Sequence, residues 1–210
     1  MGIPLALQEQ NARPGFTTRV LSRWAMQVHL AFPEARDALP PAGRTRSRIS
    51  GNPVREMVPP DPAAARARFG LEPGSRVVLV VGGSQGSQAL NRAVLEAVEA
   101  AEAGHVQRPD DLQILWASGP DHLSGVRRRM EELGGPDWVR ALGYIEDMPL
   151  ALGIATLAVS RAGAMATSEF LAWGIPAILV PLPTAAADHQ SRNAESLAAA
   201  GAGLHLAEAE

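Results

Sequence analysis

At 210 residues, the chain is long enough for one large domain or for one and a half smaller ones. Hydrophobic residues make up 46% of it and charged residues 20%, as is ordinary for a soluble globular protein. The formal net charge of −3 and the few scattered aromatic residues give no reason to expect nucleic-acid binding. The absence of cysteine excludes disulfides, cysteine-based zinc sites and a thiol nucleophile. The longest apolar run, residues 150–159, is about half as long as a membrane-spanning helix, so we expect a soluble or at most peripheral protein.

The first 60 residues contain few regular elements. Residues 4–7 and 26–32 are predicted to be strands with a helix between them, and residues 33–48, rich in Pro, Arg and Ala, are predicted to be loop. Residues 58–62 contain three prolines, which favours a hinge and places a domain boundary near residues 55–62. Two or so strands cannot close a core, and residues 204–206 are not followed by a closing helix. We therefore expect both ends to be truncated.

After the hinge, short apolar strands alternate with helices. The helix after the first of these strands has apolar residues at Leu90, Val94, Leu95 and Val98, the spacing of one buried face. This alternation predicts an α/β fold whose parallel sheet is covered on both faces. The predicted strands span residues 76–81, 112–117, 139–142, 157–160 and 175–180, with another helix from about 165 to 174.

Three polar or glycine-rich segments follow predicted strands, at the sheet edge where open α/β folds bind ligands. The first is a possible phosphate loop, although glycine could equally be needed only for a tight turn. The second, residues 161–169, opens a helix whose free N–H groups can meet a diphosphate. Its Glu169 can accept hydrogen bonds from two ribose hydroxyls, or can be a surface carboxylate favoured by the helix dipole. The third is residues 188–193. The possible phosphate loop consists of Gly82, Gly83, Ser84, Gln85 and Gly86.

Taken together, six segments in order and spacing resemble the MurG family, bacterial transferases that add N-acetylglucosamine to lipid I. The matching segments are residues 8–11, 51–55, 82–86, 143–148, 161–169 and 188–190 with Asn193. The resemblance implies a fold of the GT-B type, with two facing Rossmann-like domains that have parallel sheets. Residues 1–57 would be the last part of the acceptor-side domain, residues 58–62 the hinge, and residues 63–210 the domain that binds UDP-N-acetylglucosamine, truncated at its C-terminus.

The resemblance also implies roles for individual residues at the donor. Ser84 would lie near the diphosphate, which the amides of a helix start would cap, while the backbone of Ile145 would read the uracil. Glu169 would hold the ribose and Gln190 the sugar hydroxyls, and Arg55 and Asn11 would reach in from the hinge and the first domain. The capping amides would come from Ala164, Met165, Ala166 and Thr167, followed by Ser168.

In the chemistry that the family implies, the acceptor C4 hydroxyl attacks the anomeric carbon and inverts it, with no obligatory metal or other cofactor. The family's N-terminal glycine-rich loops, which carry the general base, have no counterpart here, and Gln8 stands where the family commonly has His. Two alternatives stay open: a non-catalytic nucleotide-sugar binding module, and another UDP-sugar enzyme such as an epimerase.

Residues 13–24 have the pattern of a basic amphipathic helix. Three arginines, Arg13, Arg19 and Arg23, accompany Phe16 and Trp24. Such a helix can lie on an anionic membrane, and the family works at the cytoplasmic face of the bacterial inner membrane as a peripheral protein. Packing of this helix on the first domain's sheet is an equally good interpretation.

Overall fold

A computed structural model describes residues 3–185 and 188–208. Contacts divide the chain into two compact units, and each is described by itself. Unit 1 comprises Met1–Arg55, Ala162–Glu169 and Val180–Glu210, and unit 2 comprises Glu56–Arg161 and Phe170–Leu179. Residues 50–61 contain no helix or strand.

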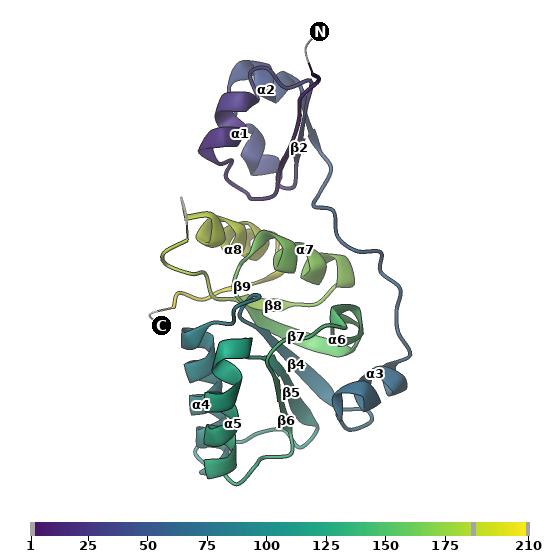
Figure 1. The fold of residues 1–210 in the computed structure, drawn as a ribbon, viewed down its shortest axis with the longest axis vertical. Coiled ribbons are helices and arrows are strands. Elements are labelled where there is room, and N and C mark those ends of the chain that lie inside the picture. The colour runs from purple at the N-terminus through teal and green to yellow at the C-terminus, as the bar shows by residue number, and fades with distance from the viewer. Residues whose placement is uncertain (1–2, 186–187, 209–210) are drawn as a thin grey trace. The chain divides into compact units, whose positions relative to one another are not determined.

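Unit 1 has a parallel sheet of three strands in the order β1-β2-β3. Its core is small and consists mainly of Val28 and Leu30 from β2 with Leu39, all fully buried. Helices α1 and α2 lie beside this sheet (Figure 1). The elements of this unit are β1 (Ala6–Glu9), α1 (Phe16–Leu21), β2 (Gln27–Leu30), η1 (Pro33–Arg36), α2 (Pro41–Thr45), β3 (Ser47–Ile49), α8 (His189–Ala199) and β9 (Gly203–His205).

The prediction of a loop at residues 33–48 is wrong. This segment contains η1, α2 and the start of β3, because its prolines lie at the first turns of η1 and α2, where a missing N–H costs nothing. The helix predicted between the first two strands is present but shorter than the pattern of residues 13–24 suggests. It begins after Gly15, which is its N-cap, and ends at Leu21.

The strands of unit 2 lie in one sheet in the order β6-β5-β4-β7-β8. The pairs from β6 to β8 are all parallel, which confirms the α/β fold class. The strands of unit 2 are β4 (Arg76–Val81), β5 (Leu112–Ala117), β6 (Val139–Leu142), β7 (Ala155–Ser160) and β8 (Ala177–Leu179). The remaining elements are α3 (Pro62–Phe69), α4 (Gln88–Glu102), η2 (Pro120–His122), α5 (Leu123–Glu132) and α6 (Met148–Ile154), together with α7 (Ala164–Trp173), whose residues up to Glu169 belong to unit 1.

Helices α4 and α5 cover one face of the strands β4, β5 and β6, while α3 and α6 lie on the other side (Figure 1). The core under α4 and α5 centres on Trp116, which is fully buried. Helix α3 begins at Pro62, where the side chain of Asp61 accepts a hydrogen bond from the Ala63 amide, and it ends at Gly70 in the left-handed conformation that favours glycine. None of the helices in the described ranges is long and apolar enough to cross a bilayer.

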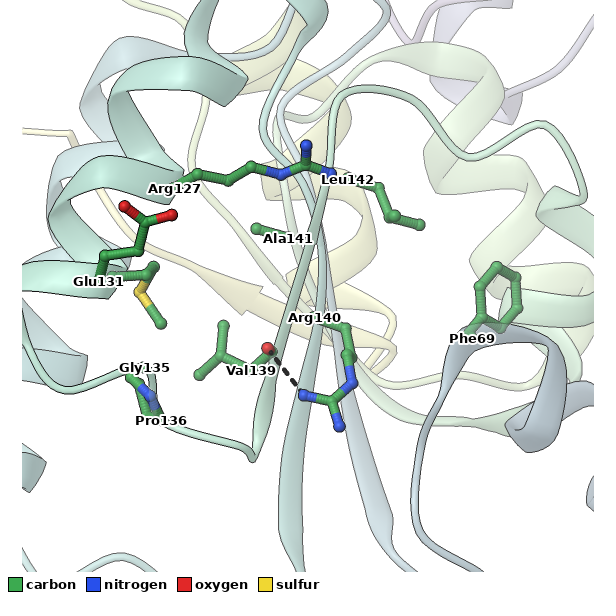
Figure 2. A pocket seen from close by; sticks show the side chains of 10 residues that line it. Phe69, Arg127, Glu131, Gly135, Pro136, Val139, Arg140, Ala141 and Leu142 are labelled. Atoms are coloured by element: carbon green, nitrogen blue, oxygen red, sulfur yellow. Dashed lines mark hydrogen bonds between the residues drawn. The ribbon is translucent and has the colours of Figure 1, made fainter.

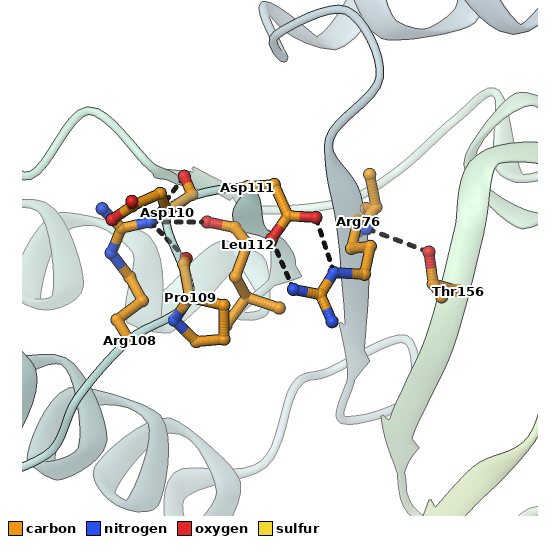
Figure 3. A network of polar contacts seen from close by, with 8 residues as sticks. Arg76, Arg108, Pro109, Asp110, Asp111, Leu112 and Thr156 are labelled. Atoms are coloured by element: carbon orange, nitrogen blue, oxygen red, sulfur yellow. Dashed lines mark hydrogen bonds and ion pairs between the residues drawn. The ribbon is translucent and has the colours of Figure 1, made fainter.

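A polar network joins the first residues of β4 and β5 (Figure 3). The guanidinium of Arg76 donates to both carboxylate oxygens of Asp111, and its backbone N–H donates to the Asp111 carbonyl at 2.8 Å. The hydrogen bond from Arg76 lowers the pKa of Asp111. Arg108 donates to three backbone carbonyls nearby, which fixes the turn that leads into β5. This network lies where the strands begin, at the opposite end from the glycine-rich turns.

Candidate functional site

The glycine-rich turn of unit 2 follows β4 directly and leads into α4. A Cβ atom on Gly82 would lie 2.5 Å from the Ser87 nitrogen, and one on Gly86 would collide with the Ser118 carbonyl oxygen. Two of its glycines therefore serve close packing, and Gly86 also has a φ of +78°. Ser84 and Gln85 are exposed at the tip. The turn thus presents Ser84 at the carboxyl end of β4, as the sequence predicts.

The ends of β5 and β6 are tied to each other at the edge of the sheet where β4 also ends. The Gly119 amide donates to the Gly143 carbonyl at 3.1 Å, and the Ser118 amide donates to the Leu142 carbonyl at 2.9 Å. Beneath this edge, Asn91 donates to the Ser118 carbonyl and accepts from the indole N–H of Trp116. Sequence reasoning missed Asn91, because it interrupts the apolar face of α4 with no motif around it.

Ile145 and Arg161 lie in the loops after β6 and β7 of the same unit. Ile145 is 2% exposed, so its side chain anchors the loop, whereas the neighbouring Tyr144 is exposed. Arg161 is buried and donates from Nε to the Ser87 hydroxyl at 3.0 Å. Since Ser87 is the N-cap of α4, a guanidinium is held beside the glycine-rich turn. Arg161 belongs to the motif at residues 161–169, but the motif by itself indicates no role for it.

The start of α7 belongs to unit 1. The amides of a helix's first turn have no acceptor inside the helix. The N–H groups of Ala164, Met165 and Ala166 therefore have no acceptor within the helix. These are N–H groups that the sequence predicts to cap a diphosphate. The Thr167 amide instead donates to the Gly163 carbonyl at 3.0 Å. The hydroxyls of Thr167 and Ser168 donate to carbonyls of the same turn, which stiffens this helix start.

Glu169 lies next along α7 and is half-buried. Burial raises the pKa of its carboxyl group, and the nearby positive charge of Arg55 opposes that shift. Arg55 and Glu169, two of the predicted site residues, therefore lie close enough within unit 1 for the charge of one to affect the pKa of the other. Gln190, on α8, accepts a hydrogen bond from the Leu182 amide at 3.0 Å through its side-chain oxygen.

Three asparagines of unit 1, Asn11, Asn52 and Asn193, form what we call the asparagine cluster. Asn193 is fully buried; its oxygen accepts from the Ala12 amide at 2.9 Å, and its nitrogen donates to the Ala162 carbonyl at 3.1 Å and to Asn11 Oδ1 at 3.2 Å. Asn52 donates to the Ala164 carbonyl and to the Ser168 hydroxyl. Both therefore hold the segment that begins α7.

Asn11, a predicted donor contact, is held on both sides of its amide. Its nitrogen donates to Glu9 Oε1 at 3.3 Å while its oxygen accepts from Asn193. The buried carboxylate of Glu9 also accepts from the backbone amides of Asn11 and Gly15. The sequence resemblance contained Asn52 and Asn193 but did not indicate that they bond to the start of α7.

The chain shares its sequence with a large group of transferases. Residues 77–210 match the family described as the glycosyltransferase family 28 C-terminal domain. The UDP-N-acetylglucosamine--N-acetylmuramyl-(pentapeptide) pyrophosphoryl-undecaprenol N-acetylglucosamine transferases of Salinibacter ruber and Bacillus subtilis are 43% and 34% identical to it. These alignments cover the whole of this chain but 54% and 56% of the two relatives, so the chain spans about half their length.

Solved structures agree with this assignment. The crystal structure of Acinetobacter baumannii MurG matches with a TM-score of 0.72 and 32% identity, over 99% of this chain and 54% of that one. A glycotransferase of kitacinnamycin matches with a TM-score of 0.60 at 21% identity, over 89% of this chain and 43% of that one, and so supports the fold alone. The chain therefore belongs to the MurG family and contains the C-terminal domain of glycosyltransferase family 28.

Proposed function

We propose that the chain is the donor-binding part of an inverting transferase that moves N-acetylglucosamine from UDP-N-acetylglucosamine to lipid I, which makes lipid II for peptidoglycan. The observation that carries this proposal is the 43% identity, along the whole chain, to a relative whose name states that reaction. The six motifs of the sequence analysis fall within the aligned region and include every residue to which we assign a contact with the donor.

The proposed domains follow one another along the chain. Residues 1–57 belong to the acceptor-side domain, residues 58–62 form the hinge, and residues 63–210 bind the donor. Two observations support this division: residues 50–61 contain no helix or strand, and the family match begins at residue 77.

In the proposed reaction, the C4 hydroxyl oxygen of the acceptor bonds to the anomeric carbon from the face opposite the diphosphate. The bond from that carbon to the diphosphate oxygen breaks, UDP leaves with the bonding electrons, and a base takes the hydroxyl proton. The open amides of Ala164, Met165 and Ala166 stabilise the charge on the departing diphosphate, because helix N-termini are fixed dipoles that need no rearrangement. Ser84 and the glycine-rich turn, residues 82–86, contribute further donors on the diphosphate.

The nucleoside and the sugar are held by separate groups. The backbone of Ile145 pairs with the uracil edge. The side-chain amide nitrogen of Gln190 donates to a sugar hydroxyl while its oxygen accepts from the Leu182 amide. Glu169 accepts from the two ribose hydroxyls and must be ionised to do so, which the charge of Arg55 favours. Asn11 contacts the donor with its side-chain amide, whose position is fixed by the hydrogen bonds to Glu9 and from Asn193.

Calorimetric titration of the chain with UDP-N-acetylglucosamine tests the donor site. We expect saturable binding that CDP does not reproduce, and a loss of about tenfold or more in affinity for Glu169→Ala, since a charged hydrogen bond contributes roughly 1.5–3 kcal/mol. Glu96→Ala, an exposed carboxylate on α4, is the matched control and should bind normally. A folded chain that gives no binding heat contradicts the donor site. Equal affinities for the two variants contradict the ribose role of Glu169.

We also propose that the protein binds the cytoplasmic face of the inner membrane through the surface around α1. Phe16 and Trp24 are 75% and 64% exposed, and Arg19 and Arg23 are exposed beside them. An apolar side chain that can enter the headgroup region, next to cations that meet anionic lipid, is typical of peripheral membrane proteins.

Sedimentation with anionic phospholipid vesicles tests this surface. Arg19→Glu combined with Arg23→Glu should abolish binding, whereas Arg127→Glu combined with Arg128→Glu makes the same change of net charge on α5 and should leave binding intact. Unchanged binding of the α1 variant contradicts the proposal, and so does an equal loss in the α5 variant.

A further inference from the structure

A cavity of about 420 Å³ lies in unit 2 along the outer edge of β6. β6 is the last strand in its sheet order and pairs with β5 alone among the described strands. The cavity is bordered by all four residues of β6, by α5, by the turn at residues 135–136 and by Phe69 at the end of α3 (Figure 2). It lies outside the strand ends that carry the proposed donor site.

The backbone of β6 directs some of its pairing groups away from β5, toward this cavity. The carbonyls of Trp138 and Leu142 accept from the amides of Ile114 and Ser118, so alternate residues of β6 face β5. Val139 and Ala141 consequently direct their N–H and C=O groups away from the sheet. The Val139 N–H donates to the Pro136 carbonyl at 3.4 Å, and the Val139 carbonyl accepts from the Arg140 side chain at 3.4 Å, so both groups have long local hydrogen bonds. Ala141 is therefore the residue at which another strand can add.

Positive charge lies on both sides of this edge. Arg127 projects from α5 and, within the described part of the chain, has no ion pair, and Arg140 projects from β6 and donates to the Gly70 carbonyl at 2.8 Å. In Figure 2 the guanidinium of Arg127 lies near Leu142, and that of Arg140 lies at the other end of the strand, beyond Val139. Glu131 is the single carboxylate in the lining. The edge therefore complements a negatively charged strand.

We propose that the outer edge of β6 binds an extended acidic peptide segment of a partner protein as an additional strand. The segment pairs through the N–H and C=O of Ala141, and its apolar side chains contact Met130 on one face and Phe69 on the other.

The arrangement of the arginines also specifies the peptide. Val139 and Ala141 share the face covered by α5, from which Arg127 projects, whereas Arg140 lies on the opposite face beside Gly70. Side chains of a strand alternate between faces. One carboxylate on each face therefore requires acidic residues at odd spacing, adjacent or three apart. Two acidic residues that are two apart point to the same face and reach only one arginine.

Fluorescence anisotropy with labelled peptides of about six residues, the usual strand length, tests this proposal on the 210-residue chain. The first peptide is rich in Thr and Val and carries an adjacent Asp-Glu pair. The second has the same composition with the two acidic residues two apart, and the third has lysines in their place. We expect saturable binding of the first, about tenfold weaker binding of the second, which corresponds to roughly 1.4 kcal/mol, and none of the third. Equal binding of any two overturns the proposal.

Variants locate the binding edge. Arg127→Glu should weaken binding of the first peptide about tenfold, whereas Arg128→Glu, the exposed neighbour outside the cavity, should change it by less than about twofold. Equal effects of the two overturn the proposal. Ala141→Pro removes the outward N–H without removing a bond to β5 and should abolish binding. Hydrogen exchange of the Ala141 amide in the unaltered chain should slow on binding, and unchanged exchange overturns strand addition.

Discussion

Replacement of Asn193 by alanine is the sharpest test of how unit 1 is held together. Asn193 lies on α8 and is fully buried, with one acceptor bond and two donor bonds. Its partners come from distant parts of the chain: Ala12 is 181 residues away and Ala162 is 31 residues away. Alanine removes all three bonds and leaves the N–H of Ala12 and the C=O of Ala162 without a partner.

The expected loss of stability follows from those two groups. A buried backbone group that loses its partner costs about 1–3 kcal/mol, so two of them cost about 2–6 kcal/mol. A typical domain is stable by only about 5–15 kcal/mol. Asn193→Ala should therefore remove a large part of the stability of the unit that contains α8. Urea unfolding followed by circular dichroism measures the loss. Hydrogen exchange of the Ala12 amide should become faster, and the free energy of opening obtained from it should fall by at least about the same amount.

Arg192→Ala, on the same helix, is the matched control. Among the described residues, Arg192 forms only surface ion pairs, with Glu195 and Asp188. Such pairs contribute little, so its replacement should change stability by less than about 0.5 kcal/mol. A loss below about 1 kcal/mol for Asn193→Ala, a tenth or so of a typical domain's stability, refutes the role of the asparagine cluster. An equal loss in both variants attributes the effect to α8 as a whole and refutes it as well.

Three further predictions concern single positions. Gly86→Ala adds both the cost of a positive φ and a collision with the Ser118 carbonyl, whereas Gly134→Ala adds only the backbone cost of about 1–3 kcal/mol. Urea unfolding should therefore show a larger loss of stability for Gly86→Ala, and equal losses contradict the collision. Burial raises the pKa of Glu169, so this group's contribution to stability is fully present below its unfolded pKa and is lost as pH rises through its folded pKa. Glu169→Gln should flatten that part of the pH–stability curve in thermal melts, and an unchanged curve contradicts the shift. The pKa of Asp111 is lowered, so the stability that it contributes is present above its unfolded pKa and is lost as pH falls through its folded pKa; Arg76→Ala should remove this acid sensitivity, whereas Arg92→Ala, on α4, should not.

The sheet of unit 2 is predictable from sequence because its strands are continuous apolar runs bounded by turn residues. β4, β5 and β6 begin and end at the predicted residues. For β4 and β5, which lie inside the sheet, burial on both faces leaves little room for polar residues, and the edge strand β6 is bounded by Pro136 and Gly143. The segment at residues 33–48 was not predictable by the same reasoning. Proline breaks a helix in its interior but is favoured at its first turn, and a composition rich in proline does not distinguish the two.

The candidate site is predictable only where it is local in sequence. The glycine-rich turn and the start of α7 each lie within one short motif, and both lie where the motif places them, after β4 and after β7. The bonds that hold them are between distant residues. Arg161 reaches Ser87 across 74 positions, and Asn52 reaches Ser168 across 116. No periodicity records such pairings, so the positioning role of Asn52 and Asn193 becomes visible only in the folded chain.

The place of β4 in the middle of its sheet has a consequence for synthesis on the ribosome. β4 pairs with β5 on one side and with β7 on the other, and Val81 lies 79 residues before Ser160, with which it is paired. At about 5–20 residues per second, β7 emerges some 4–16 s after β4. During that interval an apolar, β-branched strand has at most one neighbour and is open to pairing with other nascent chains. A holdase chaperone that covers residues 76–81 for those seconds should raise the yield of folded protein, and one added after release should not.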